Sequence, residues 1–316
     1  MTSFRSEIKI PKSVFKIKYT DAIFCIGSCF TEHIHKKFES LFFSSYSNPN
    51  GIVYNPVSIS RQINHLLSDE EWASLDLYFD GELYHGLHHH GDFSGRNEQA
   101  VLDNMNESGR YAKEHLEKSD VVLVTLGTSI VYVLKEKNIL VANCHKIPNY
   151  SFERKFLEVD EIVDSTSEWI NALTRINPQV NIILTISPVR YLKEGFTDNT
   201  LSKARLALAV EKLVKSNNNI HYFPAYEIVL DDLRDYRFYS EDLAHPNRTA
   251  IDYVWSKFKE IYFNQDSIHL LDKLDQIRKA KNHRPIHADS MEHRKFLAKL
   301  EMDIIELKMK YPDLNL

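Results

Sequence analysis

Short apolar runs that alternate with helical patterns are the feature that most constrains how this chain folds. The clearest run is DVVLVTLGTS at 120–129, which fits a strand buried on both faces. Strands that alternate with helices predict a mostly parallel, doubly wound sheet. We expect about five strands, near residues 22, 43, 121, 181 and 221. We expect helices at 31–42, 57–68, 98–119, 160–178, 202–217 and 246–263.

Three stretches depart from this alternation. Residues 130–146 are expected to form a hairpin after the strand at 120–129, and residues 69–98 are expected to be irregular. From residue 266 onward the sequence is helical and charged. We therefore predict one domain at 1–265 and a helical C-terminal region at 266–316. That region is expected to dock across the site, to form a dimer contact or to be a solvated tail.

The composition of the 316-residue chain argues against several classes of protein. Hydrophobic residues make up 43% and charged residues 26%, which is the profile of a soluble globular protein. No membrane span and no secretory signal are apparent, so we expect a cytoplasmic location. The net charge of -5, without a basic stripe, is not typical of a nucleic-acid-binding protein. Cys25, Cys29 and Cys144 are expected to be free thiols.

The turn between the first predicted strand and helix carries two candidate nucleophiles. Gly27 allows a sharp turn, and Ser28 and Cys29 follow at the start of the helix. The unpaired N–H groups and positive dipole of a helix N-terminus stabilise an attacking anion and the oxyanion that it creates. Such a site also lowers the pKa of a thiol. The same residues fit an ordinary strand-to-helix turn with a small buried cysteine, so this motif alone decides nothing.

A second motif, YSEDLAHPN at 239–247, supplies a carboxylate and an imidazole. Asp242 is close enough to His245 to hold its Nδ1–H, which leaves Nε2 free as a base. Pro246 disfavours a helical conformation at His245, so we expect this histidine on a loop beside the sheet. The alternative is an aspartate that caps a helix next to a surface histidine.

Together with other stretches, these motifs resemble a known family. The motifs are GSCFTEHI, SNPNGIVYNP, VTLGTSIVY, VANCHK, ISPVR, SKARLALA, YFPAYEIVLDDLRDYRFY and DLAHPN, over roughly residues 20–262. In this order they resemble the GSCFA domain family of the SGNH, or GDSL-type, hydrolase superfamily. The resemblance implies a three-layer α/β/α, flavodoxin-like fold and acyl-ester chemistry, with no metal and no organic cofactor. It says little about the substrate.

The resemblance also implies a role for each residue that falls on a superfamily motif. The catalytic serine is the third residue of the superfamily's first block, and Cys29 occupies that place in GSCF. Ser28 is the alternative nucleophile. Asp242 and His245 fall on the terminal Asp-x-x-His block. Gly51 falls on the glycine whose N–H lines the oxyanion hole.

The third block departs from the superfamily pattern. That block ends in Gly-x-Asn, and its asparagine amide donates to the oxyanion, whereas here Gly127 is followed by Thr128 and Ser129. Thr128, Ser129 and Asn143 are the candidate replacements. Asn143 and His145 are expected to share one face of the hairpin and to line the pocket. Loss of one such donor costs about 10²- to 10³-fold in rate, so this position bears on whether the protein is active.

The remaining candidates are a histidine cluster and an arginine. The cluster consists of His85, His88, His89 and His90, with Asp92 after it. It fits a metal site, a polar wall of the substrate pocket to which His90 contributes, or a surface loop. Adjacent histidines on a loop diverge in direction, so we expect no metal. Arg190 follows the fourth strand and is expected either to contact substrate or to form a buried salt bridge.

These observations predict an ester or thioester hydrolase with a Cys/Ser–His–Asp triad. The expected substrate is a small-molecule or carbohydrate acyl ester. An acyltransferase and a catalytically inactive binding protein on the same fold are the alternatives, and the missing asparagine favours the second of these. The sequence leaves open whether the protein is a monomer or a homo-oligomer.

Overall fold

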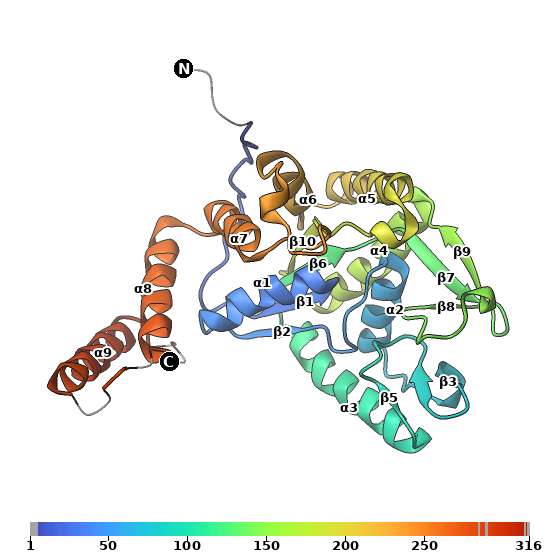
Figure 1. The fold of residues 1–316 in the computed structure, drawn as a ribbon, viewed down its shortest axis with the longest axis horizontal. Coiled ribbons are helices and arrows are strands. Elements are labelled where there is room, and N and C mark those ends of the chain that lie inside the picture. Colours follow the sequence, from blue (N-terminus) through green and yellow to red (C-terminus); the bar gives the residue numbers. More distant parts are fainter. Residues whose placement is uncertain (1–5, 284, 288–289, 313, 315–316) are drawn as a thin grey trace.

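A five-stranded parallel sheet forms the centre of the protein (Figure 1). The computed structural model describes residues 6–283, 285–287, 290–312 and 314. The strand order is β11–β10–β6–β1–β2, and every neighbouring pair is parallel. This is the flavodoxin-like order, and the five predicted strands are confirmed. Their bounds are β1 Ile23–Gly27, β2 Ser45–Ser47, β6 Val121–Leu126, β10 Asn181–Ile186 and β11 Ile220–Phe223.

Side chains that alternate along each strand divide the core between the two faces of the sheet. On β6, Val121 and Leu123 pack on the first face, and Val122, Val124 and Leu126 pack on the second. Every residue of β6 is buried. A central parallel strand is covered on both sides, which explains why its sequence is a continuous apolar run and not an alternating one.

Helices cover both faces of the sheet (Figure 1). The first face is packed by α1 Cys29–Ser40, α6 Ala225–Glu227, the π-helical turn Ile228–Asp232 and α7 Arg248–Tyr262. The second face is packed by α2 Pro56–Leu67, α3 Glu98–Glu117, α4 Val159–Ile176 and α5 Phe196–Ser216. The helices predicted from the sequence are therefore confirmed, although α5 begins at Phe196 and not at residue 202. In the described part of the chain, no helix is both long and apolar enough to cross a membrane.

Two small antiparallel sheets are inserted between these elements. One contains β3 Leu77–Phe79, β4 Tyr84–Gly86 and β5 Ser94–Gly95, and the other contains β7 Ile130–Leu134, β8 Ile139–Val141 and β9 Phe152–Phe156. The predicted hairpin at 130–146 is confirmed, with β9 as a third strand. The prediction of irregular structure at 69–98 was wrong for the part that forms β3, β4 and β5. Such short strands have too few positions to show an alternating pattern.

The C-terminal region is helical, as predicted, and consists of α8 Gln265–Lys281 and α9 Met291–Lys310. In Figure 1, α8 leads away from α7, and α9 lies beyond α8 on the far side from the sheet. Leu270, Leu271 and Leu274 of α8 join the core of the first face. Part of the segment that links α8 to α9, at 284 and 288–289, lies outside the described residues. A domain boundary after residue 265 remains a prediction.

The loops of the predicted site leave one edge of the sheet because the strands are parallel. β1 ends at Gly27, β6 at Leu126 and β10 at Ile186. The loop after β10 is joined to the loop before α7, since the Arg190 N–H donates to the Ala244 carbonyl oxygen (3.1 Å). Segments that are far apart in sequence therefore meet at the C-terminal edge of the sheet.

The turn at Gly27 has no room for a side chain. Its φ is +135°, and an added Cβ would lie 2.2 Å from the Thr125 carbonyl oxygen. We expect Gly27→Ala to lower the free energy of unfolding by more than about 3 kcal/mol, because about 1–3 kcal/mol of backbone strain adds to a clash with rigid backbone. Thermal and urea denaturation measure this loss.

Gly81→Ala is the matched control for this substitution. Gly81 has a φ of +100° but open space around an added Cβ, so its variant should show only the backbone strain. Equal losses of stability in the two variants would contradict the close approach of β1 to β6.

Candidate active site

Cys29 is the first residue of α1 and directly follows the turn after β1. Its thiol is partly exposed. Burial raises the pKa of this thiol, and the ammonium group of Lys203 opposes the rise. The backbone N–H groups of Phe30 and Cys29 also favour the thiolate. On balance the pKa of the Cys29 thiol is raised, so the prediction that the helix N-terminus lowers it was wrong. The thiol is accessible, and Lys203 and the two backbone N–H groups offset only part of the effect of burial.

Ser28 presents a much less accessible hydroxyl. Its side chain is only 1% exposed, it makes no capping bond at the start of α1, and its Oγ has no hydrogen-bond partner. The Ser28 backbone holds the turn, because its N–H donates to the Thr125 carbonyl (3.1 Å) and its carbonyl accepts the Thr31 N–H (2.8 Å). A substrate carbonyl cannot reach the hydroxyl unless this turn opens. Of the two side chains, that of Cys29 is therefore the more accessible.

Asp242 and His245 form a close pair on the loop before α7. Asp242 Oδ2 lies 2.5 Å from His245 Nδ1, and Oδ1 accepts the N–H groups of Ala244 and His245, both at 3.0 Å. These bonds, chiefly those from the backbone, lower the pKa of Asp242 to about 2. The carboxylate is therefore charged and orients the imidazole through Nδ1. Asn247 caps α7 by accepting the Ala250 N–H (3.1 Å), so Asp242 is not the helix cap.

His245 lies beside the first turns of α1. His245 and His33 line the same groove, and the two rings are close enough to interact electrostatically. His33 is four residues after Cys29, so it lies on the same face of the helix about 6 Å further along. Although the structure describes all three side chains, no hydrogen bond joins His245 to Cys29 or Ser28. The candidate base and nucleophile are neighbours in the fold and are not hydrogen-bonded to each other.

The turn that contains Gly51 is tied to the start of α1. Asn48 Oδ1 accepts the Gly27 N–H (2.8 Å), and its Nδ2 donates to Glu32 (2.8 Å). Gly51 has a φ of +77° and packs so tightly on His90 that an added Cβ would lie 2.2 Å from the His90 Cβ. The Gly51 N–H donates to the Asn48 carbonyl oxygen (2.8 Å). In this structure the Gly51 N–H therefore closes a turn, and its role as an oxyanion donor remains a prediction.

Thr128 and Ser129 are also committed to internal contacts. Thr128 Oγ1 lies 2.9 Å from Ser202 Oγ and accepts the Ile130 N–H (3.0 Å). Ser129 is fully buried, and its N–H donates to Ser202 Oγ (2.7 Å). Both residues thus fix the loop after β6 to α5. The structure gives neither of them the exposure that an oxyanion donor would need.

Asn143 and His145 lie on the loop after β8. Asn143 Oδ1 accepts the His145 N–H (2.9 Å). His145 Nε2 lies 2.9 Å from the Gly86 carbonyl oxygen, and its ring stacks on His85. The prediction that Asn143 and His145 share a strand face was wrong, because β8 ends at Val141 and His145 has a φ of +47°.

Lys203 is a residue of the site that the sequence analysis missed. Its side chain lies in the interior, where Nζ donates to the carbonyl oxygens of Gly127 (2.6 Å) and Ser187 (2.7 Å). Burial lowers the pKa of Lys203 to about 7, and Cys29 acts in the opposite direction. The signal was present in SKARLALA, because Lys203 falls on the buried stripe of α5. A lysine at such a position requires buried acceptors.

The histidine cluster contributes contacts and buried side chains to the region of the small sheet of β3, β4 and β5. His85 Nε2 lies 2.9 Å from Asp80, His88 lies 3.2 Å from Arg61, and His89 is fully buried. Burial lowers the pKa of His88 to about 3 and that of His89 well below its usual range. Among the residues that the structure describes, no group of three or more His, Cys, Asp or Glu side chains is placed to hold a metal ion.

Arg190 forms no buried salt bridge within the described residues. Its guanidinium lies 5.2 Å from the centre of the Phe196 ring, and its backbone N–H tethers the loop of His245. The alternative, in which Arg190 contacts substrate, remains a prediction.

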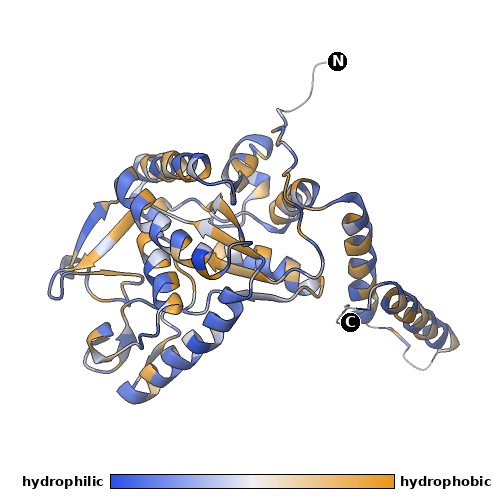
Figure 2. Ribbon diagram, turned by 180° about the vertical axis from the view of Figure 1, so that it is seen from behind, coloured by the Kyte–Doolittle hydropathy of each residue, from blue (hydrophilic) through white to orange (hydrophobic). Residues whose placement is uncertain are grey.

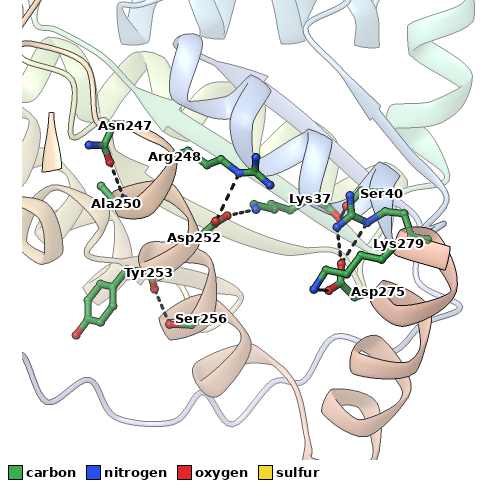
Figure 3. Close-up of polar contacts among 11 residues, drawn as sticks. Lys37, Ser40, Asn247, Arg248, Ala250, Asp252, Tyr253, Ser256, Asp275 and Lys279 are labelled. Atoms are coloured by element: carbon green, nitrogen blue, oxygen red, sulfur yellow. Dashed lines mark hydrogen bonds and ion pairs between the residues drawn. The ribbon is translucent and has the colours of Figure 1, made fainter. Parts of the chain in front are cut away.

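A groove of about 830 Å³ runs beside His245. Its walls come from α1, the loop before α7, α7 and α8, and Asp242 and His245 line it whereas Cys29 does not. Figure 3 shows its charged residues: Lys37 of α1 pairs with Asp252 of α7, and Lys279 pairs with Asp275 on α8. Charged walls of this kind suit a polar, hydrated ligand.

The chain belongs to the GSCFA family. The model of the GSCFA family matches residues 22–258, and that of the GSCFA domain protein, C-terminal domain, matches residues 274–316. No curated protein matches the chain.

The solved structures to which the chain shows some similarity include esterases. A carbohydrate esterase family 3 protein from Talaromyces cellulolyticus has 12% sequence identity and a TM-score of 0.39, with 80% of this chain and 98% of that chain covered. An acetyl xylan esterase from the rumen bacterium Butyrivibrio proteoclasticus has 11% identity and a TM-score of 0.37, with 77% and 66% covered. At this level of similarity, the assignment of a site rests on the residues of this chain alone.

The contact between Lys203 and the thiol site predicts a change in cysteine reactivity. We expect Lys203→Met to slow alkylation of Cys29 by iodoacetamide several-fold below neutral pH, because loss of the ammonium charge raises the pKa of the thiol and so lowers its thiolate fraction. Since the pKa of Lys203 is about 7, the difference from the wild type should be greatest below that pH and should shrink above it. Mass spectrometry of the Cys29 peptide measures the rate.

Lys215→Met is the matched control for this prediction. Lys215 lies on the same helix, but its side chain is 73% exposed and pairs with Glu211, so its loss should leave the Cys29 rate unchanged. Circular dichroism verifies that both variants are folded. An unchanged rate in folded Lys203→Met would contradict the electrostatic effect of Lys203 on Cys29.

Proposed function

We propose that this member of the GSCFA family hydrolyses acyl esters or thioesters, with Cys29 as the nucleophile. His245 is the general base and acid, and Asp242 orients it. The observation that carries the proposal is the arrangement around the start of α1. A partly exposed thiol occupies the helix N-terminus, and a carboxylate-held imidazole lies on the loop beside the same helix.

The reaction proceeds through a thioester on Cys29. His245 Nε2 takes the thiol proton as the sulfur attacks the acyl carbonyl carbon, and the carbonyl electrons move to oxygen. The intermediate then collapses, the bond to the leaving group breaks, and the imidazolium gives its proton to that group. Water, deprotonated by His245, next attacks the acyl-enzyme. The carbon–sulfur bond breaks, the acid is released and the thiol regains its proton.

The first step requires His245 to approach Cys29, since the two are not hydrogen-bonded in this structure. About 45% of the His245 side chain is exposed, so no packed core holds the ring away from the sulfur. The loop is closed at its ends by a bridge between Tyr239 and Pro246. Catalytic hydrogen bonds are often long before substrate binds and tighten in the complex.

The N–H groups of Cys29 and Phe30 are the proposed donors to the oxyanion. They belong to the first two residues of α1, so they have no acceptor within the helix. Within the described residues, neither group donates to a backbone carbonyl elsewhere. They replace the Gly51 N–H, which is bonded to the Asn48 carbonyl. A helix N-terminus also favours the negative charge that develops on this oxygen.

The proposed substrate is a polar small-molecule or carbohydrate ester. The charged walls of the groove beside His245 support a polar substrate, and the superfamily resemblance makes an acetylated carbohydrate the first substrate to test. An acyltransferase would form the same acyl-enzyme and would pass the acyl group to an alcohol or amine in place of water. Product analysis with and without such acceptors separates the two reactions.

A catalytically inactive binding protein on this fold is the second candidate. Two observations favour it: Ser129 occupies the place of the third-block asparagine, and within the described residues His245 has no hydrogen bond to Cys29 or Ser28. This candidate predicts that acyl esters bind in the groove without turnover.

Substitution of the proposed triad tests the enzyme directly. We expect Cys29→Ala and His245→Gln each to lower kcat/KM for p-nitrophenyl acetate by at least about 10³-fold, because each removes a group that acts in the transition state. Asp242→Asn should lower it by about 10²- to 10⁴-fold through loss of the correct imidazole tautomer. Initial rates on purified protein provide the measurement.

Cys144→Ala is the control, since it removes another partly exposed thiol outside the proposed triad and should leave the rate unchanged. Full activity of Cys29→Ala together with loss of activity in Ser28→Ala would move the nucleophile to Ser28. Binding of acetylated sugars by calorimetry without any turnover would support the binding protein instead.

A further inference from the structure

The outermost helix, α9, has two apolar faces. The face that packs towards α8 and the core consists of Leu300, Ile304, Leu307 and Tyr311. The opposite face, here called the open stripe, consists of Ala298, Met302, Ile305 and Met309. Met302, Ile305 and Met309 are 70%, 53% and 80% exposed. Figure 2 shows hydrophobic residues along this helix, which lies at the outer end of the molecule.

The open stripe has the spacing of a coiled-coil seam. Its members follow one another at intervals of four, three and four residues, which places Ala298 and Ile305 at d positions and Met302 and Met309 at a positions of a heptad. At about 100° per residue, the stripe lies opposite the face that packs on α8. A solvated helix carries one apolar stripe, so the second one indicates a surface made for a partner helix.

We propose that α9 pairs with the α9 helix of a second copy of this chain, in antiparallel orientation. With a twofold axis midway between residues 303 and 304, Met302 of each copy faces Ile305 of the other. Ala298 then faces Met309, so a small residue meets a large one at both ends of the seam. All contacts occur twice, as an isologous interface requires.

The charges beside the seam select this arrangement. In the antiparallel pair, g positions face g positions and e positions face e positions, so Glu301 meets Lys308 and Lys299 meets Glu306. Each of these contacts joins opposite charges, and each is formed twice by symmetry. All four residues are exposed on α9, although Lys308 also interacts within its own chain and would exchange that contact for Glu301 of the second copy.

A parallel pair would bring like charges together. In parallel register, a g residue faces the e residue of the next heptad, so Glu301 would meet Glu306 and Arg294 would meet Lys299. Both such contacts that fall within α9 are repulsive. The sequence thus favours the antiparallel pair and opposes the parallel one.

A second copy also fits this surface better than a lipid membrane does. A helix that lies on a membrane is typically basic on its polar face. The flanks of the open stripe instead hold two glutamates and two lysines in a self-complementary order. α8 supports each α9 from behind, so the proposed dimer is a four-helix arrangement whose helices are already formed before they meet.

Sedimentation velocity of the full chain from about 1 to about 100 µM tests the proposal, because this range detects a dimer with a dissociation constant on the order of micromolar. We expect a monomer–dimer equilibrium for the wild type. We expect Met302→Glu combined with Ile305→Glu to remain monomeric throughout, since two acidic pairs replace the centre of the seam. Leu201→Glu with Leu208→Glu is the control, because these residues of α5 are comparably exposed, at 45% and 54%. That variant should dimerise like the wild type.

A charge exchange tests the register. Glu301→Lys places two lysine pairs across the interface and should weaken the dimer at least about tenfold, and the added change Lys308→Glu should restore it to within about threefold. Three results would overturn the proposal. The first is wild-type protein that stays monomeric at the highest concentration, and the second is a dimer that persists in the variant with Met302→Glu and Ile305→Glu. The third is failure of Lys308→Glu to restore the association that Glu301→Lys weakens. If the wild-type protein is monomeric and co-sediments with anionic phospholipid vesicles, the open stripe binds a membrane, and the proposed dimer is also overturned.

Discussion

The close approach of β1 to β6 at Gly27 is the constraint on which the site depends. Because a side chain at this position would collide with the Thr125 carbonyl, only glycine lets β1 run up to β6 and then turn with a φ of +135°. The turn buries Ser28 and makes Cys29 the first residue of α1. Asn48 accepts the Gly27 N–H and so brings the next loop to the same point. One steric requirement therefore sets which of the two side chains, the hydroxyl of Ser28 or the thiol of Cys29, is accessible.

Electrostatics at this edge of the sheet combine two opposing effects. Burial disfavours the charged form of both Cys29 and Lys203, so it raises the pKa of the thiol and lowers that of the amine. Each charge in turn favours the other. The carbonyl oxygens of Gly127 and Ser187 hold the ammonium group in place and join the loops after β6 and β10 to α5. Lys203 therefore has two roles. It joins these loops to α5, and it supplies a positive charge that favours the thiolate form of Cys29.

The sequence predicted those parts of the structure that burial on both faces imposes. β6 appears as a continuous apolar run because helices cover it on both sides, and the spacing of Asp242 and His245 predicted their pairing. The small strands β3, β4 and β5 are too short to show a pattern. The bond of the Gly51 N–H to Asn48 depends on how a turn closes, and the burial of Ser129 depends on how α5 packs. Neither is encoded in residue type, and the depth of Lys203 became clear only once the buried face of α5 was known.

The central claim is that Cys29 carries the acyl group, and capture of the acyl-enzyme tests it most directly. Wild-type protein mixed briefly with p-nitrophenyl acetate and quenched in acid is digested, and the peptide that contains Ser28 and Cys29 is fragmented by mass spectrometry. The account predicts one acetyl group on Cys29, removable by neutral hydroxylamine as a thioester is. An acetyl group on Ser28, or no adduct on either residue under conditions of turnover, would contradict it.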